Sequence, residues 1–315
     1  MPTEEPKKIL DREFSKAAVT PITELSTPLL VELVNAGLMI WRRCELEVGR
    51  DGRENEDVAA IVLYRHLIEM VDGIQVLIAD SCGTSAIPVL RSAFEGTTSL
   101  LYLLSEDAKY VERSLAWLVA EVHAGIAARQ LLDPSTARGQ GYLQLYQKEL
   151  GSVRQPVPKI ALADEIRQME ASLQSSQLAP IEAEYQRVKA ATRRTPNWFC
   201  LFGGPGNRAD LAGQVGFGAM YQLLYADWSA VSHGTDLGRY LSGHGGRPAF
   251  DAVRRPVELQ QIALFAAVLV LRASRAMINR FRKGENLEPW YVRDVKPLFD
   301  RLADLRIEFS PLVQE

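Results

Sequence analysis

Residues 86–104 read AIPVLRSAFEGTTSLLYLL, and residues 58–80 before them read VAAIVLYRHLIEMVDGIQVLIAD. In both stretches the apolar residues recur every three or four positions, the spacing that places them on one face of an α-helix. Only the short segment Ser81-Cys82-Gly83-Thr84 interrupts this pattern. Long helices that are joined by short turns indicate a helical bundle.

The same spacing extends to both sides of these two helices. A strand-like alternation of apolar and polar residues is nearly absent, and Trp198–Phe202 is the one short strand candidate. Further helices are predicted at 26–48, 107–132, 142–150, 159–192, 210–232, 256–283 and 289–306. The predicted fold class is therefore all-α: a multi-helix bundle with a protruding polar helical hairpin and glycine-rich loops.

The chain divides into a short arm and one domain. Residues 1–20 are polar and contain two prolines, which predicts a flexible N-terminal arm. Residues 21–315 are expected to form a single helical domain. Within it, residues 142–192 are rich in Gln, Glu, Lys and Ala, and we interpret them as an exposed helical insertion. Glycine-rich loops are predicted at 203–218 and 234–248.

Composition and charge place the chain among ordinary globular proteins. Of its 315 residues 47% are hydrophobic and 24% are charged, which argues against both disorder and a membrane protein. The net charge of -3 provides no global attraction for nucleic acid or anionic lipid. The N-terminus lacks the apolar core of a signal peptide, and the longest apolar run, 262–271, is too short to span a bilayer. We therefore expect a cytoplasmic protein with no membrane partner.

Arg91 and Glu95 lie four residues apart, so their side chains meet on one face of the predicted helix. Because the surrounding sequence is apolar, we expect the pair to lie in the bundle interior, where an arginine and a carboxylate must be paired. This interpretation favours a structural ion pair. The alternatives are an ordinary surface pair and a catalytic pair, since perturbed charges also mark active sites.

Tyr221, Tyr225, Ser229 and His233 follow one another at intervals of four residues. On a helix this spacing makes one polar and aromatic stripe. One interpretation is a hydrogen-bonded seam against another helix, with His233 near the helix C-terminus, where the helix dipole favours a cation. The other interpretation makes the stripe a ligand-binding surface and His233 a general acid or base.

Other patterns predict no cofactor and no metal. The glycine-rich segment 203–218 matches neither of the common phosphate-binding loop motifs, so we expect a flexible loop. His66 and Glu69 have a spacing that occurs in metal sites, but this spacing is common by chance and the rest of a di-iron pattern is missing. Basic residues also gather near the end of the helix predicted at 256–283. They are Arg272, Arg275, Arg280, Arg282 and Lys283. Cations are favoured at a helix C-terminus, and a phosphate-binding patch is the alternative.

These motifs resemble those of a widespread bacterial family of helical proteins of unknown function. The family carries R-S-x-x-E on an apolar helix, and the residues here are Arg91, Ser92 and Glu95. Further on it carries a tryptophan, a glycine and then Y-x-x-x-Y-x-x-x-S-x-x-x-H. The residues that match are Trp198, Gly216, Tyr221, Tyr225, Ser229 and His233. The resemblance covers about residues 60–240. It implies a helical fold and marks these residues as shared, and it implies no established activity.

Three functions are consistent with these residues. The first is a ligand-binding or interaction module with a polar site centred on His233, which takes a small polar ligand, a protein partner or a second copy of the chain. The second is a metal-independent ribonuclease-like enzyme acting on RNA, with His233, Arg91 and Glu95 as catalytic candidates. The third is a metal-dependent helical-bundle enzyme that uses four side chains: His66, Glu69, Glu95 and His233. We favour the first, because no arginine precedes His233 at the spacing that such ribonucleases use and no metal motif is complete.

Overall fold

The helices of the computed structural model confirm the predicted all-α fold class. The structure describes residues 12–49, 52, 54–150, 162–226, 241–244, 247–250, 254 and 258–306. Contacts divide the chain into two compact units. Unit 1 comprises Met1–Gly52, Ala60–Ser105 and Ala209–Glu315, and unit 2 comprises Arg53–Ala59 and Glu106–Arg208. The arm at 1–20 and the single domain at 21–315 stay predictions.

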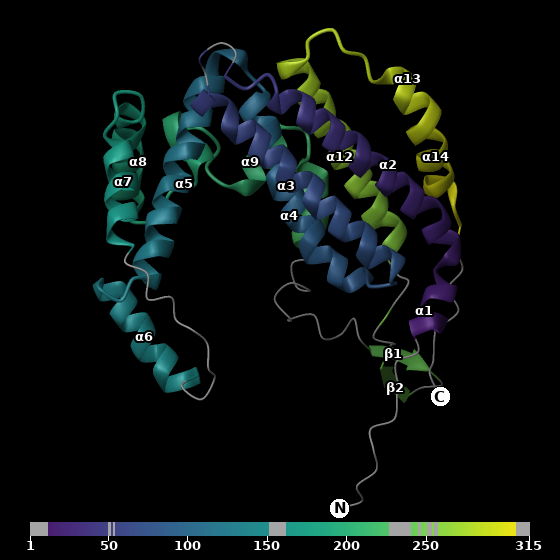
Figure 1. Ribbon diagram of the computed structural model, residues 1–315. Coiled ribbons are helices and arrows are strands. Elements are labelled where there is room, and N and C mark those ends of the chain that lie inside the picture. The colour runs from purple at the N-terminus through teal and green to yellow at the C-terminus, as the bar shows by residue number, and fades with distance from the viewer. Residues whose placement is uncertain are drawn as a thin grey trace, which may run out of the picture. The chain divides into compact units, whose positions relative to one another are not determined.

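Long helices form the centre of unit 1 (Figure 1). They are α2 (Thr20–Glu45), α3 (Glu54–Ala79), α4 (Gly83–Leu104) and α12 (Leu259–Phe281). α12 packs against both α2 and α4. Gly37 of α2 lies so close to α3 that an added Cβ would collide with the side chain of Ile68. The buried hydroxyl of Tyr64 on α3 lies 2.7 Å from Oγ of Ser274 on α12. The apolar helix faces therefore meet in one core.

By length and composition alone, α12 is able to cross a membrane. In the structure, 56% of its most apolar stretch is buried, and the helix contacts α2 and α4. A core helix of a globular protein has the same length and composition. The length and composition of α12 do not test the expectation that the chain has no membrane partner. That expectation stays a prediction.

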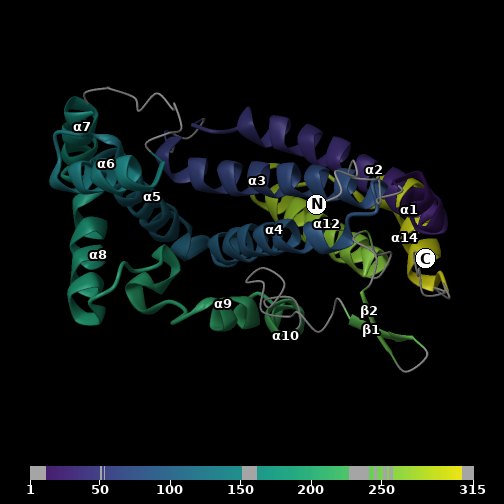
Figure 2. The same cartoon turned by 90° about the horizontal axis from the view of Figure 1, so that it is seen from below.

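Shorter elements flank this core. Next to α2 are α1 (Arg12–Ala18), α13 (Glu288–Trp290), the π-helical turn η4 (Tyr291–Val295) and α14 (Lys296–Asp304). Figure 2 shows two further helices beside α4, namely α9 (Arg208–Gln214) and α10 (Gly218–Ala226). Two short strands, β1 (Leu241–His244) and β2 (Arg247–Phe250), pair in antiparallel fashion. The position of α10 against α4 is the one that matters for the site.

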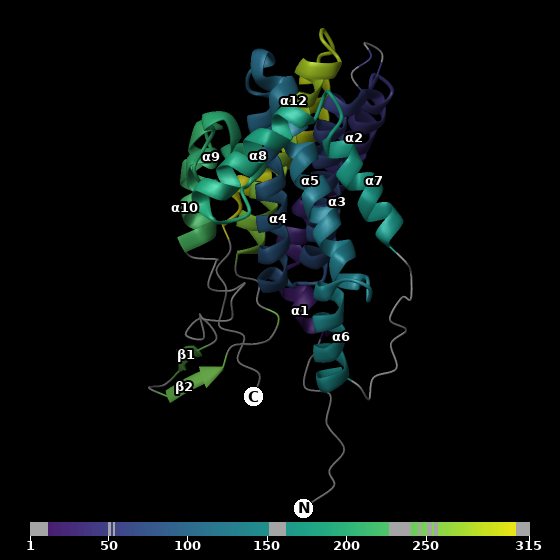
Figure 3. The same ribbon diagram turned by 90° about the vertical axis from the view of Figure 1, so that its left-hand side faces the viewer.

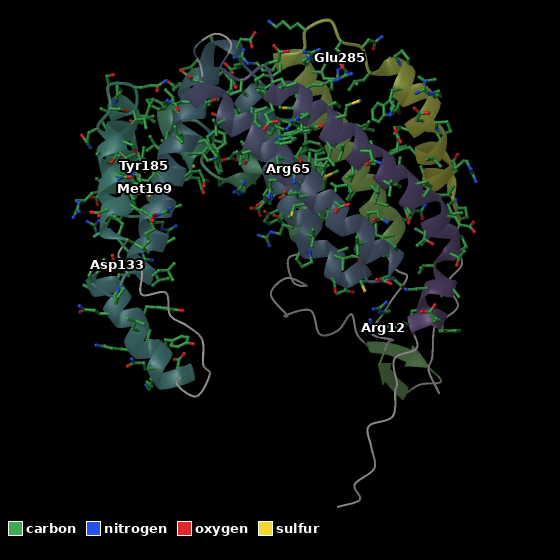
Figure 4. All side chains as sticks on the ribbon, in the orientation of Figure 1. Arg12, Arg65, Asp133, Met169, Tyr185 and Glu285 are labelled. Carbon is green, nitrogen blue, oxygen red and sulfur yellow. The ribbon has the colours of Figure 1, made fainter. Side chains whose placement is uncertain are left out.

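Unit 2 is built around α5 (Figures 1 and 3). Its elements are η1 (Asp107–Lys109), α5 (Tyr110–Leu132), α6 (Ala137–Leu150), α7 (Ala163–Leu173), α8 (Ala179–Thr192) and η2 (Trp198–Gly203). α7 and α8 carry Met169 and Tyr185, which Figure 4 labels. The His123 ring of α5 stacks on Tyr185 with centroids 4.2 Å apart, and its Nε2 lies 2.7 Å from Oε2 of Glu182. The described part of the polar stretch predicted at 142–192 thus forms α6, α7 and α8, with a turn at 174–178 between the last two, and α7 and α8 pack against α5.

Two helix and strand predictions were wrong in their details. Trp198–Phe202 is the 3-10 helix η2 and not a strand, because its apolar side chains serve a buried turn instead of a sheet face. The helix expected to begin at residue 26 begins at Thr20, with Pro21 in its first turn. Pro28 lies inside this helix on its exposed side, so the second proline was mistaken for the start signal.

The glycine-rich regions differ from the predictions as well. The helix predicted at 210–232 is divided into α9 and α10, because Gly216 has a φ of +74° and ends α9. The loop predicted at 234–248 contains β1 and the start of β2, with Leu241 paired to Phe250. Residues 227–240 lie outside the described part of the chain.

Candidate functional site

Near the middle of α4, three polar side chains remain accessible. Between Leu90 and Leu100 every residue is buried except Arg91, Ser92 and Glu95, which are half-buried. Arg91 and Glu95 are also the only charged residues of α4. The apolar spacing of the sequence explains the burial of the other residues, because it turns them towards the core. The R-S-x-x-E residues therefore remain accessible in an otherwise buried stretch of α4.

Tyr225 of α10 joins the Arg91–Glu95 pair. Arg91 Nε donates a hydrogen bond of 3.2 Å to Glu95 Oε1, and the Tyr225 hydroxyl donates to the same oxygen. Cζ of Arg91 lies 4.1 Å from the centroid of the Tyr225 ring, within the range of a cation–π interaction. The Arg91 and Glu95 side chains are 26% and 29% exposed. The expected position deep in the bundle interior was therefore wrong, because the face of α4 that carries the pair is only partly covered.

The contacts of this cluster shift two pKa values. Burial, and then the hydrogen bond to the Glu95 carboxylate, raise the pKa of Tyr225 to about 12. Burial lowers the pKa of Arg91, but hydrogen bonds to Tyr225 and Glu95 more than offset this and raise it overall. At neutral pH the cluster therefore holds a charged guanidinium and a protonated phenol, both of which are hydrogen-bond donors.

Aromatic rings continue from Tyr225 towards α12, and we call them the aromatic stack. Tyr225 stacks on Tyr221 with centroids 4.2 Å apart and an interplanar angle of 17°. Tyr221 is followed by Phe94 at 6.4 Å, and Phe94 meets Phe217 edge-on at 5.9 Å. Cζ of Arg272 lies 4.3 Å from the Phe217 centroid. An arginine thus covers each end of the stack, which ties α4, α10 and α12 together.

His66 of α3 approaches α4 from the other side. Its Nε2 lies 3.1 Å from Oγ of Ser92. Gly96 permits this approach, because a Cβ at that position would lie 3.0 Å from Cδ2 of the His66 ring. From the sequence, His66 was a candidate only for a metal site. It lies 26 residues from Ser92 on another helix, so no spacing pattern in the sequence connects the two.

Of the four residues in the predicted stripe, the structure describes the first two. Tyr221 and Tyr225 lie one turn apart on α10, and their rings stack as the four-residue spacing predicts. Ser229 and His233 lie outside the described residues. The structure therefore brings together Arg91, Glu95 and the two tyrosines, and the roles of Ser229 and His233 stay predictions.

The other sequence candidates make local contacts. Glu69 accepts a hydrogen bond of 2.9 Å from Nε of Arg65, one turn before it on α3. The same arginine lies over the Trp41 ring at 5.2 Å. Within the described part of the chain, no three side chains of His, Cys, Asp or Glu gather closely enough to hold a metal ion.

The basic residues of α12 and the turn after it do not act as one patch. Arg272 donates to the carbonyl oxygens of Val215 and Gly216 at 2.8 and 3.3 Å. Arg282 forms ion pairs with two glutamates. Arg275 lines a groove of about 520 Å³ at the end of α12. Arg272 and Arg282 thus make contacts that join parts of the fold, and neither of these contacts is with the carbonyl groups at the end of α12.

Comparison with known proteins places the chain in a family. No curated protein and no solved structure matches it. Residues 57–248 match the profile of DUF5677, described as a family of unknown function, and this range is more than half of the 315 residues. All residues of the predicted stripe and of R-S-x-x-E fall within the matched range. The match confirms the resemblance to a family of unknown function, and the chain belongs to the family DUF5677.

Proposed function

We propose that this protein is a ligand-binding module and that Arg91, Glu95 and Tyr225 hold a small polar ligand. The observation that carries the proposal is the convergence of these three side chains, from two helices, on a half-buried face. An arginine has five N–H donors, and the bond to Glu95 uses the one on Nε. The guanidinium is held in place by the tyrosine ring, so a ligand meets a preorganised donor. Ser229 and His233, which continue the stripe in the sequence, stay further candidates for contacts with the ligand.

A purely structural role explains the cluster less well. A half-exposed ion pair adds little to stability, whereas a pair that is needed for folding is usually buried and costly to break. Here both charged side chains are more than a quarter exposed. The geometry around Arg91 is also more elaborate than a surface pair requires, because one carboxylate oxygen accepts bonds from two different helices.

The chain offers a matched control for Arg91. Arg65 and Glu69 form a pair with the same spacing of four residues, and Arg65 likewise lies over an aromatic ring, that of Trp41. This pair is more exposed, at 40% and 52% of the two side chains. Arg65→Gln therefore removes the same chemical groups as Arg91→Gln but leaves the proposed site intact.

The test is a thermal-shift comparison of the wild type, Arg91→Gln and Arg65→Gln against a panel of small carboxylates, phosphates and amides. A ligand that binds the folded state raises the melting temperature according to its concentration and affinity. We expect at least one compound to stabilise the wild type and Arg65→Gln but not Arg91→Gln. If every compound that stabilises the wild type also stabilises Arg91→Gln, the proposal is wrong.

The described contacts favour neither enzymatic alternative. A metal site would need Glu69 and Glu95, but each of these carboxylates already accepts a hydrogen bond from an arginine. A ribonuclease-like reaction would depend on His233, which lies outside the described residues. Both alternatives therefore stay predictions with tests of their own.

A further inference from the structure

α4 presents two pairs of residues next to each other. Arg91 and Glu95 form the first pair, and Ser92 and Gly96, each one position further along, form the second. Because each pair spans one helical turn, the two pairs make neighbouring stripes on the same side of α4. α10 contacts the first stripe and α3 contacts the second. The half-buried polar residues thus lie between two flanking helices.

The His66 ring is held against α4 by one edge. Its Nε2 atom lies 3.1 Å from Ser92 Oγ, and its Cδ2 atom is the one that a Cβ on Gly96 would approach most closely. In an imidazole ring Nδ1 is the atom opposite the bond between Nε2 and Cδ2, so here it is directed away from α4. Among the described residues, none forms a hydrogen bond with Nδ1 of His66. Within the described part of the chain, a ligand at Nδ1 would thus not have to displace a protein partner.

A second hydrogen bond of α3 shows what a purely structural contact looks like in this fold. Tyr64 and Ser274 join α3 to α12 through hydroxyl groups 2.7 Å apart, and the two residues are 0% and 1% exposed. The contact between His66 and Ser92 differs, because both residues are only half-buried. Polar groups that converge and stay accessible are typical of ligand-binding sites.

We infer that His66 and Ser92 form the second wall of the proposed site and that its ligand carries a compact oxyanion, either a carboxylate or a phosphate group. This inference rests on the proposed function, since Arg91 makes the first contact. A guanidinium, a hydroxyl and an imidazole are all able to donate to an acceptor-only group. The negative charge of Glu95 is partly balanced, because Arg91 and Tyr225 both donate to its carboxylate.

The experiment follows the histidine rings of the full chain by NMR, with ¹⁵N-labelled histidine. The chain has four histidines, and single His→Gln variants assign their ring signals. Sodium acetate and inorganic phosphate are titrated separately, so the two sources of the oxyanion are distinguished. We expect one of them to shift the ring signals of His66 in a saturable manner. Arg91→Gln and Ser92→Ala should each weaken this binding about tenfold, the loss expected for one hydrogen bond to a charged group.

Two variants serve as controls. His123→Gln removes a histidine of unit 2 and should leave the titration of His66 unchanged. Arg91→Lys keeps the charge but loses the planar fork of donors, and it replaces Arg91→Gln if that variant is unstable. The affinity of Arg91→Lys for the same anion should also be lower than that of the wild type.

The outcomes separate this inference from the proposed function. If an anion binds in an Arg91-dependent manner while the ring signals of His66 stay unchanged, the inference is overturned and the proposed function stands. A shift at His66 that is equally strong in Arg91→Gln also overturns it, because the two walls would then not share a ligand. If neither anion produces a shift at His66, the oxyanion is the wrong ligand class, and the wider ligand panel decides the proposed function.

Discussion

The guanidinium of Arg91 lies 4.1 Å from the centroid of the Tyr225 ring, and both side chains donate to Oε1 of Glu95. Tyr225 lies 130 residues from Glu95 in the chain. The two motifs that stood out in the sequence therefore meet in one half-buried cluster. Because the ring and the carboxylate together fix the guanidinium, its remaining donors have a defined direction.

Tyr225→Phe should make stability less sensitive to alkaline pH. The ordinary pKa of a tyrosine is 10.0, whereas that of Tyr225 in the folded protein is raised to about 12. Between these values the unfolded state binds fewer protons than the folded state, so the free energy of unfolding falls as the pH rises. Urea unfolding at several pH values in this interval should show a shallower fall for Tyr225→Phe than for the wild type. Tyr142→Phe, at an exposed position, is the control, and equal slopes for all three proteins would refute the raised pKa.

Gly96→Ala should fail to stabilise α4. In a helix interior, alanine is favoured over glycine by about 1 kcal/mol. The Cβ of Gly96→Ala would lie 3.0 Å from Cδ2 of His66, so the ring must move and the bond to Ser92 weakens. Gly73→Ala is the matched control on α3, because its Cβ would meet Val89 at an ordinary 3.8 Å. Urea unfolding should show a higher free energy of unfolding for Gly73→Ala only. An equal gain for both variants would mean that His66 is not held against α4.

Arg272→Met should loosen the turn between α9 and α10. The variant removes the hydrogen bonds to the carbonyl oxygens of Val215 and Gly216 and the contact with the Phe217 ring. We expect the free energy of unfolding to fall by about 1–2 kcal/mol. Arg275→Met, three residues further along α12 at an exposed position, should change it by less than about 0.5 kcal/mol. Similar losses for the two variants would show that Arg272 does not anchor the turn.

His233→Ala tests the ribonuclease-like alternative. A ligand-binding module should leave total RNA intact in EDTA, both as the wild type and as His233→Ala. Gel analysis of incubated RNA provides the measurement. Cleavage by the wild type that disappears in His233→Ala, with melting temperature unchanged, would instead establish a metal-independent nuclease.

The long helices could be predicted from the sequence, and their exact ends could not. The apolar spacing in α3, α4 and α12 is regular, so it predicts both the helices and their buried faces. Pro28 gives the same start signal as Pro21, which lies about two turns earlier in the first turn of α2, so the sequence alone does not decide between them. The break at Gly216 depends on a positive φ, which a single glycine permits but does not announce.

The site could be predicted only in part. Arg91 with Glu95, and Tyr221 with Tyr225, are four residues apart, so helix geometry alone brings each pair together. The contact between the two pairs, and that between His66 and Ser92, depends on how separate helices pack. Sequence spacing carries no information about such contacts between helices. His66 was therefore missed as a neighbour of the R-S-x-x-E motif.

The central claim is that the Arg91–Glu95–Tyr225 cluster binds a ligand and is not a seam that holds the fold together. The most direct measurement is the free energy of unfolding of Arg91→Gln beside the wild type, with Arg65→Gln as the matched control. We predict that each variant loses about 1 kcal/mol or less, as expected for half-exposed charged pairs. A loss of about 3 kcal/mol or more in Arg91→Gln alone, the cost of breaking a buried ion pair, would contradict the claim and make the cluster structural.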